Sequence, residues 1–245
     1  MVQSIDRAFR VLTEVARGRS GVTEIAEATG LPKSTVARML ASLEELGALV
    51  RDGAGYRVGD TIRSLAASIS TTQTLVRVAH PILTDLVRSL GEDVGLGLPD
   101  GNRVHYVAQV DAANPVQVRD WTGERAALHT TSSGLVLLAS WPAEALDAYL
   151  AGPLDRATPS TPVEPAGIRA ALDAARATGY AWTVDTFAEG IGSVAAPIRD
   201  PRGKVIAAVH AHGPSYRFPK PGREAAIGAE LVRAAERIEG KLAGS

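Results

Sequence analysis

Apolar residues between positions 22 and 58 recur first at helical spacing and then in alternation. Thr23 is a candidate cap for a first short helix, and Gly30 supplies the flexible residue that ends it. Pro32 suits the first turn of a second helix, which Gly47 closes. Two short alternating runs around a glycine-containing turn follow. This order predicts a winged helix-turn-helix.

The second helix has two chemically different faces. Its apolar residues recur every three or four positions and are predicted to face a core: Val36, Leu40, Leu43 and Leu46. Its start and its outward side carry basic and hydroxyl side chains: Lys33, Ser34, Thr35, Arg38 and Ser42. Such groups donate to phosphates and base edges. We predict that these five residues, with Arg57 on the wing, contact DNA. The alternative is a helical packing unit without a nucleic-acid partner.

Helical periodicity also flanks this motif. The first 16 residues predict an amphipathic helix with one apolar face: Ile5, Phe9, Leu12, Val15 and Ala16. Residues 60–74 are compatible with a linker helix that runs into a polar Ser-Thr stretch. A further helix is predicted over 75–90, with an interruption at Pro81 and an end at Gly91.

The remainder of the chain alternates between strand and helix patterns. Strands are predicted at 94–98, 103–110, 115–121, 180–184, 193–199 and 205–212, and helices at 132–140, 143–150, 165–178 and 221–242. An antiparallel sheet with helices on its faces is an α+β sensory-type module. We therefore expect a DNA-binding domain over 1–60, a linker helix over 61–74 and an effector-binding domain over 75–245.

Charge and composition constrain the partners. With 26 Lys and Arg against 27 Asp and Glu in 245 residues, the net charge is −1, so the chain has no global basic field for non-specific binding to nucleic acid. DNA affinity must come from a local patch. One nearly neutral domain binds weakly, which favours a homodimer reading a pseudo-palindromic operator, with a tetramer as the further possibility.

The sequence contains no cysteine, so disulfides and thiolate metal sites or nucleophiles are excluded. Its first residues do not form a basic-then-apolar signal peptide, and no apolar run is long enough to span a bilayer. We expect a soluble cytoplasmic protein.

Several blocks along the whole chain resemble the IclR-type transcriptional regulators. They are QSIDRA at 3–8, GLPKSTV at 30–36, LHTTSSG at 128–134, EGIGSVAAPIRD at 189–200 and AAVHAHGPS at 207–215. The resemblance implies an N-terminal winged helix-turn-helix, a connecting helix and a C-terminal GAF-like domain. It further implies that this domain binds a small organic effector, often a carboxylate, and that dimers pair into tetramers.

The family pattern also implies where the effector binds. Its helix start falls on Ser132 and Ser133, whose amides could hold an anionic group. Its pocket aspartate aligns with Thr183. Asp185 lies two residues on, where it can face the same side of the strand, and we include it in the predicted site. The family's pocket cysteine aligns with Ser193.

The last pocket strand departs from the family. His210 and His212 stand where the family has small hydroxyl residues. We expect an effector, carboxylate or aromatic, with its anionic or polar end on the helix amides and its other end against these imidazoles. Near their ordinary pKa of about 6.5, the imidazoles would add a pH-dependent donor.

Other interpretations of these motifs are weaker. His210 and His212 could form half of a metal site, but no third ligand is identifiable, so neither metal nor cofactor is predicted. Residues 190–195 match a dinucleotide fingerprint but lead into a strand. His129 among hydroxyls suggests a small hydrolase that uses the helix-turn-helix only for packing. Because no serine elbow is present, we predict a regulator and not an enzyme.

Overall fold

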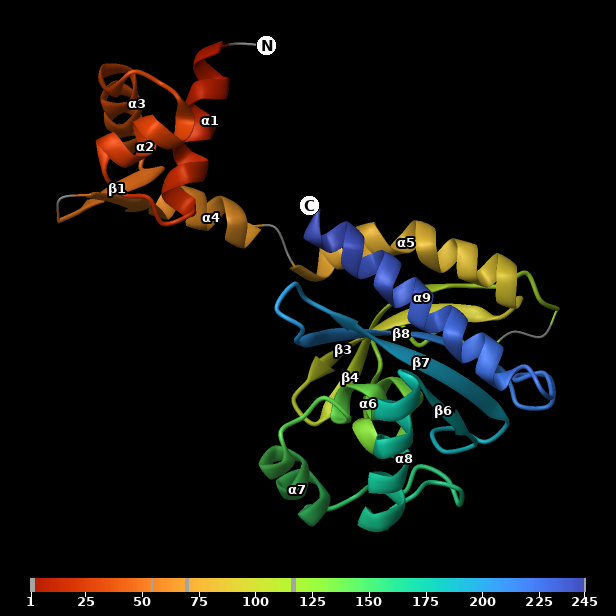
Figure 1. Ribbon diagram of the computed structural model, residues 1–245. Helices are drawn as coiled ribbons and strands as arrows, with labels where there is room; N and C mark the ends of the chain where they lie inside the picture. Colours follow the sequence, from red (N-terminus) through yellow and green to blue (C-terminus); the bar gives the residue numbers. More distant parts are fainter. Residues whose placement is uncertain (1–2, 54, 69–70, 116–117, 245) are drawn as a thin grey trace. The chain divides into compact units, whose positions relative to one another are not determined.

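The computed structural model describes residues 3–53, 55–68, 71–115 and 118–244, and the chain forms two compact units (Figure 1). The first unit comprises Met1–Thr71 and the second Thr72–Ser245. Each unit has its own hydrophobic core among the described residues.

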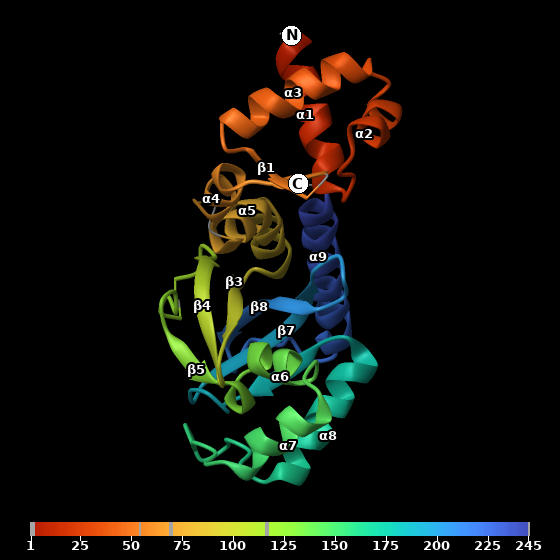
Figure 2. The same ribbon diagram turned by 90° about the vertical axis from the view of Figure 1, so that its left-hand side faces the viewer.

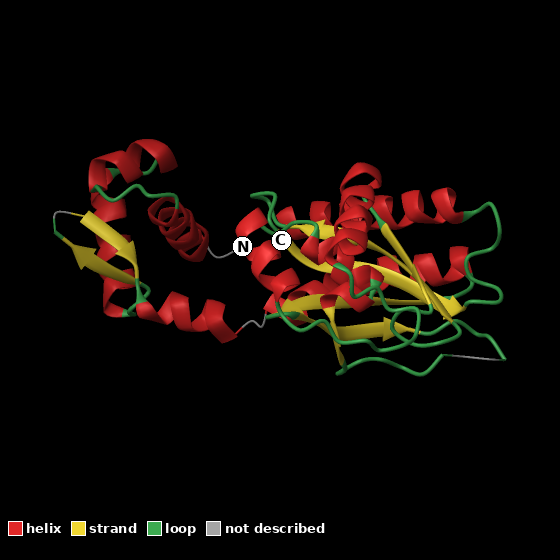
Figure 3. Ribbon diagram, turned by 90° about the horizontal axis from the view of Figure 1, so that it is seen from below, coloured by secondary structure: helices red, strands yellow, loops and turns green. Residues whose placement is uncertain are grey.

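The first unit is a helix-turn-helix followed by a hairpin. Its elements are α1 (Gln3–Ala16), α2 (Val22–Thr29), α3 (Lys33–Glu45), β1 (Leu49–Asp52), β2 (Gly55–Val58) and α4 (Asp60–Ser68). The antiparallel β1–β2 pair is the small yellow hairpin of this unit in Figure 3. Val11, Ile25, Val36 and Leu40 are fully buried between the three helices. The predicted winged helix-turn-helix is confirmed.

Glycine ends the helices of the motif as the sequence predicts, while two other expectations are wrong. Gly30 adopts a left-handed conformation with φ 68° and bonds back to Ala26. Thr23 does not cap α2, because the helix already begins at Val22, with Gly21 as its N-cap. Leu46 is 69% exposed, because α3 ends at Glu45 and Leu46 is its C-cap.

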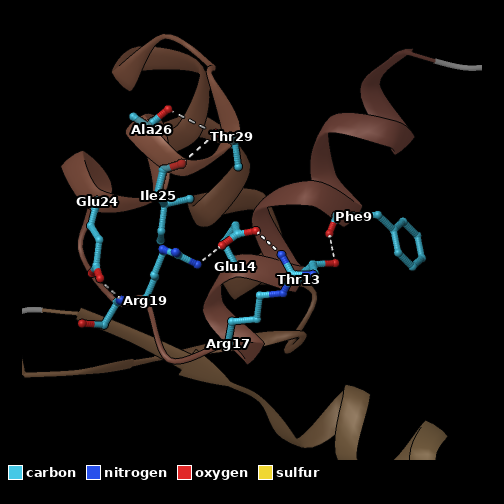
Figure 4. Close-up of polar contacts among 10 residues, drawn as sticks. Phe9, Thr13, Glu14, Arg17, Arg19, Glu24, Ile25, Ala26 and Thr29 are labelled. Carbon is cyan, nitrogen blue, oxygen red and sulfur yellow. Dashed lines mark hydrogen bonds and ion pairs between the residues drawn. The ribbon is translucent and has the colours of Figure 1, made fainter. Parts of the chain in front are cut away.

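An ionic cluster fixes the turn between α1 and α2. Figure 4 shows Arg17 and Arg19 directed at the carboxylate of Glu14, which is buried. Arg17 Nη1 lies 2.8 Å from Glu14 Oε1, and Arg19 pairs with Glu14 Oε2. The turn also reaches the wing, because the Tyr56 amide donates to the Ser20 carbonyl. These contacts tie α1 to the hairpin.

The apolar side of α1 is only partly used by this core. Val11 and Val15 are buried, whereas Ile5 and Phe9 are 57% and 65% exposed. The amphipathic helix predicted for the first 16 residues is formed, but the first half of its apolar face is exposed. There α1 presents large apolar side chains that nothing in its own described unit covers.

The second unit is a six-stranded antiparallel sheet between helices (Figures 1 and 2). Its strands are β3 (Asp93–Asp100), β4 (Arg103–Val110), β5 (Arg125–Ala127), β6 (Ala181–Val184), β7 (Ile191–Arg199) and β8 (Val205–Pro214), and their spatial order is β5-β4-β3-β8-β7-β6. Its helices are α5 (Thr71–Leu90), η1 (Leu128–Thr130), α6 (Ser132–Leu138), α7 (Ala143–Ala151), α8 (Pro165–Thr178) and α9 (Glu224–Ala243).

The two faces of the sheet carry separate cores. α5 and α9 lie side by side on one face, linked by an ion pair between Asp85 and Arg237, and α6, α7 and α8 lie on the other (Figure 1). Because side chains alternate along a strand, Val209 and Ala211 of β8 face α5 and α9, while Ala208 packs in the core on the α6 side. His210 and His212 share the face of Ala208. Strand alternation thus directs both histidines to the α6 side.

Two predictions for this unit are corrected. α5 begins at Thr71 and continues through Pro81, because buried residues on both sides, such as Ala79 and Ile82, hold the helix in place. The strand expected over 115–121 is not formed at 118–121, and positions 116–117 lie outside the described residues. Instead, the third strand on that side is β5, which pairs with the start of β4.

The longest helices, α5 and α9, have 20 residues each. Each turns buried apolar residues toward the sheet and charged residues outward. Within the described ranges, no helix is both long enough and apolar enough to cross a membrane.

Candidate functional site

One face of α3 is polar and accessible. Its exposed residues are Lys33, Ser34, Arg38 and Ser42, and Thr35 is half-buried. We call these five residues the recognition face. They lie opposite the buried Val36, Leu40 and Leu43. The core therefore fixes which side of α3 a partner can reach.

The wing adds further cations. Arg57 is exposed and its Nε lies 3.3 Å from Asp52 Oδ2, an ion pair that solvent screens. Arg51, which the sequence analysis did not select, donates from Nη2 to the Tyr56 hydroxyl at 2.9 Å. Arg51 is exposed in β1, and its position as a basic residue in the predicted wing is a signal that could have identified it.

A small cavity lies on the α6 side of the sheet. We call it the histidine cavity, and its lining residues are Tyr106, Trp121, Thr131, Thr183, Phe187, Ile191, Ser193, His210 and His212. Four of the seven residues predicted for the effector site are among them: Thr183, Ser193, His210 and His212. Its volume is about 30 Å³, roughly the space of one water molecule.

The other three predicted residues lie outside that lining. Ser132 is buried and its Oγ lies 2.7 Å from Ser193 Oγ, which ties α6 to β7. Ser133 is buried over β3, where a Cβ added at Gly97 would stand 3.6 Å from its own. Asp185 has φ 58°, and its carboxylate accepts from the Gly190 amide at 2.7 Å, so it shapes the turn before β7.

The two histidines are buried side by side. Each is 3% exposed, and their ring centroids are 5.5 Å apart in a stacked arrangement. Burial lowers the pKa of His212 to about 4. The pKa of His210 is well below its ordinary value, mainly because of burial and to a smaller extent because His212 is close. The expectation that both titrate near 6.5 is therefore corrected: both rings are neutral near pH 7.

Three aromatic residues of this cavity were missed by the sequence analysis. The Tyr106 ring meets His210 edge-on at 4.9 Å, and burial raises the pKa of Tyr106 to about 12, so its hydroxyl is neutral. Trp121 and Phe187 meet over the cavity with their ring centroids 5.0 Å apart. They come from loops 66 positions apart, and the sequence carries no local signal that brings them together.

His129 has a structural environment. Its Nδ1 lies 2.7 Å from the Tyr149 hydroxyl and its Nε2 lies 2.9 Å from the Asp155 carbonyl oxygen. Since a carbonyl only accepts, Nε2 carries the proton and Nδ1 accepts from the tyrosine. Both nitrogens are used, and the ring joins η1 to α7 and to the loop after it.

Other candidate sites are also structural. Residues 190–195 lie at the start of β7, where a Cβ at Gly192 would stand 2.1 Å from the Phe218 carbonyl oxygen. This glycine therefore permits close approach of two backbones. In the described ranges, no three His, Asp or Glu side chains come together as a metal site would require.

The chain thus combines a winged helix with an exposed basic face and a separate α+β unit that encloses a small cavity, as ligand-responsive DNA-binding regulators do. Family models agree with both units. The "IclR helix-turn-helix domain" matches residues 4–53, and the "Bacterial transcriptional regulator IclR C-terminal" matches residues 67–239. The protein belongs to the IclR family of transcriptional regulators.

Individual relatives support this assignment over nearly the full length. The HTH-type transcriptional regulator Rv1719 of Mycobacterium tuberculosis is 32% identical over 242 residues, covering 97% of this chain and 92% of its own. The glycerol operon regulatory protein of Streptomyces coelicolor is 35% identical over 243 residues, which cover 95% of this chain and 92% of that protein.

A solved structure with the same fold contains a small molecule. The IclR homologue from Microbacterium hydrocarbonoxydans, crystallised in complex with 4-hydroxybenzoate, is 28% identical. It has a TM-score of 0.65, with 99% of this chain and 100% of that chain covered. The protein is a DNA-binding transcriptional regulator of this family, and its second unit corresponds to the family's C-terminal domain.

Proposed function

We propose that α3 enters the major groove of the operator with the recognition face toward the bases, while Arg57 of the wing contacts a phosphate. The observation that supports this is the division of α3 into a buried apolar side and an exposed side of cations and hydroxyls. A helix in the major groove reads base edges, whereas a phosphate contact adds affinity without sequence preference.

We propose further that two copies of the chain assemble through the exposed half of α1. Ile5 and Phe9 form an exposed apolar pair on a helix whose Val11 and Val15 are buried. Burying this pair against its copy would stabilise a dimer with two-fold symmetry. Such a dimer would place two α3 helices on the half-sites of a pseudo-palindrome, and C-terminal units could pair dimers into tetramers.

The effector, in this proposal, occupies an opened form of the histidine cavity. Support comes from the convergence of four predicted residues on that cavity and from the small-molecule complex of the Microbacterium relative. A ligand changes operator affinity only as far as it prefers one arrangement of the two units.

The described residues around His129 do not form the catalytic arrangement that a hydrolase would need. Its two nitrogens contact Tyr149 and Asp155, while the nearby Ser132 hydroxyl pairs with Ser193. We therefore propose regulation as the activity of this chain.

The recognition face is tested with operators selected from random DNA. Fluorescence anisotropy at two salt concentrations compares Arg38→Ala and Arg57→Ala with Arg88→Ala, an exposed residue of the second unit, as control. We expect Arg38→Ala to lose roughly 5- to 100-fold in affinity and to relax base preference. Arg57→Ala should weaken all sequences alike and reduce the salt slope by about one. Unchanged binding by Arg38→Ala would remove it from the interface.

A further inference from the structure

The lining of the histidine cavity carries no formal charge. Its described lining residues are aromatic, aliphatic or hydroxyl side chains together with two imidazoles. Arg119 lies against the covering residue Trp121, with Cζ 4.1 Å from the ring centroid, but its side chain is exposed and pairs with Glu124. Among the described lining residues, then, no cation is available to an anionic ligand.

The charges that act on the imidazoles from outside are acidic. The carboxylates of Asp111 and Asp120 raise the pKa of His212, yet burial outweighs them and keeps the ring neutral. A carboxylate ligand here would lose its hydration and meet two neutral rings with two further carboxylates in the surroundings. Burying a charge without an opposite charge is strongly unfavourable, so the site disfavours anions.

The imidazoles nevertheless have hydrogen-bonding capacity to offer. In the part of the chain that the structure describes, His210 Nδ1 and both nitrogens of His212 have no partner. A neutral imidazole has one donor and one acceptor nitrogen, so His212 alone presents one of each. Buried polar groups are normally satisfied, and three unpartnered nitrogens at one cavity point to a missing polar partner.

Both rings are packed against neighbouring residues. His210 lies so close to Gly95 that a Cβ there would stand 2.7 Å from its Cε1, and Tyr106 contacts it from the next strand. His212 stacks on His210. Both rings are therefore held in position before any ligand binds.

Two aromatic residues of the cavity lining come from loops. Trp121 and Phe187 are half-buried on loops, and they contact each other above the histidines. Because the cavity of about 30 Å³ has room for no more than a water molecule, a ligand requires part of the lining to move, and the loop residues Trp121 and Phe187 are the candidates in this proposal. Two aromatic faces would then stack on a flat ligand.

The start of α6 adds no cation to the cavity, and part of its hydrogen-bonding capacity is used within the protein. This helix has seven residues, its Gly134 amide already bonds to Thr131 Oγ1 at 2.9 Å, and the Ser132 hydroxyl is engaged by Ser193. Two of the polar groups at this helix start are thus engaged within the protein, while the buried Ser133 Oγ has no partner among the described residues.

We propose that the effector of this protein is an uncharged ring compound with a paired donor and acceptor, such as a primary amide, that completes the hydrogen bonds of His210 and His212 beneath Trp121 and Phe187. This proposal rests on the proposed effector site. It differs from the sequence-based expectation of an anionic end on α6.

The experiment uses matched probes that differ only in charge. Aromatic and saturated ring carboxylic acids and their primary amides, including benzoate with benzamide and nicotinate with nicotinamide, are titrated into the full-length protein at pH 7.5. Thermal shift and calorimetry report binding, since a ligand selective for the folded state raises the melting temperature. We expect at least one amide to bind ten-fold or more tightly than its acid. Tighter binding of the acids, or no binding by any amide, overturns the proposal.

Two histidine variants separate a ligand-binding role from a structural one. Because His212→Leu removes two unpartnered nitrogens, we expect its melting temperature to rise while amide binding is lost. His129→Leu serves as the contrast, since both of its nitrogens are bonded and its loss should lower the melting temperature. A His212→Leu protein that binds amides as well as the wild type contradicts the proposal.

Nuclear magnetic resonance gives a direct view of the nitrogens. Imidazole ¹⁵N shifts should move for His210 and His212 on adding benzamide or the tightest amide, and stay unchanged for His129. Operator binding without ligand is measured separately. If the protein binds amides but no DNA, the regulatory assignment is refuted and this proposal stands. If it binds DNA but no amide, only this proposal is refuted.

Discussion

Gly95 of β3 and His210 of β8 stand opposite each other in the sheet, and the imidazole covers the glycine so closely that position 95 has no room for a side chain. A Cβ there would stand 2.7 Å from His210 Cε1 and 2.6 Å from the Ala108 carbonyl oxygen. The His210 side chain of β8 thus fits because Gly95 on β3 has no side chain.

Substitution of Gly95 by alanine should therefore destabilise the second unit. We expect a loss of about 1–3 kcal/mol in the free energy of unfolding, since the backbone and the ring cannot both yield. Urea denaturation measures it. Gly167→Ala in α8 is the control, because its Cβ meets nothing within 4 Å and alanine favours helix. Equal stability of the two variants would show that the contact at Gly95 is unimportant.

Acid should destabilise the protein through His212. Its pKa is about 4 in the folded chain and about 6.5 when unfolded, so the unfolded state binds more protons between these values. The contribution of neutral His212 to the free energy of unfolding is fully present above about pH 6.5. It falls by about 3 kcal/mol as the pH drops to 4. Unfolding free energies of wild type and His212→Leu across this range measure it. The variant should show the shallower slope, and parallel curves would refute the prediction.

The ion pair between Arg217 and Glu92 should contribute to stability. Arg217 Nε and Nη2 lie 2.7 and 2.9 Å from the two oxygens of Glu92, whose carboxylate is buried. Arg217→Ala leaves that carboxylate uncompensated, and we expect a loss of roughly 2–4 kcal/mol. Arg88→Ala breaks an exposed pair with Asp85 and should cost under about 1 kcal/mol. Similar losses in both variants would contradict this reasoning.

Dimer formation should depend on Phe9. Phe9→Glu places a charge in the proposed interface, and we expect self-association at least ten-fold weaker in sedimentation equilibrium, with a matching loss of operator affinity. Tyr216→Glu, which changes an aromatic residue that is 75% exposed in the second unit, should associate as the wild type does. A stable Phe9→Glu dimer would place the interface elsewhere.

Local patterns were sufficient to predict most of the fold. Period-two alternation located β4 over Arg103–Val110, and helical spacing with a terminal glycine located α8 over Pro165–Thr178. The exceptions have tertiary causes. Leu46 and Phe9 carry the apolar signal of a core residue but lie beyond the helix end or on an uncovered side, which periodicity cannot distinguish.

The cavity was predictable only in part. Strand alternation shows that His210 and His212 share a face. It does not show that Gly95 and Tyr106 contact His210 there, because those residues come from β3 and β4. Trp121 and Phe187 meet through two loops without regular structure. The depth of burial that keeps the imidazoles neutral is likewise a property of the assembled sheet and helices.

The most direct test measures operator affinity with and without the tightest-binding amide, in wild type and in His212→Leu. Fluorescence anisotropy should show the same ligand-free affinity for both proteins, because position 212 lies in the second unit. Added amide should shift the wild-type affinity by roughly 5- to 150-fold and leave the variant unchanged. A shift of equal size in both proteins would contradict the claim that regulation begins at the histidine cavity.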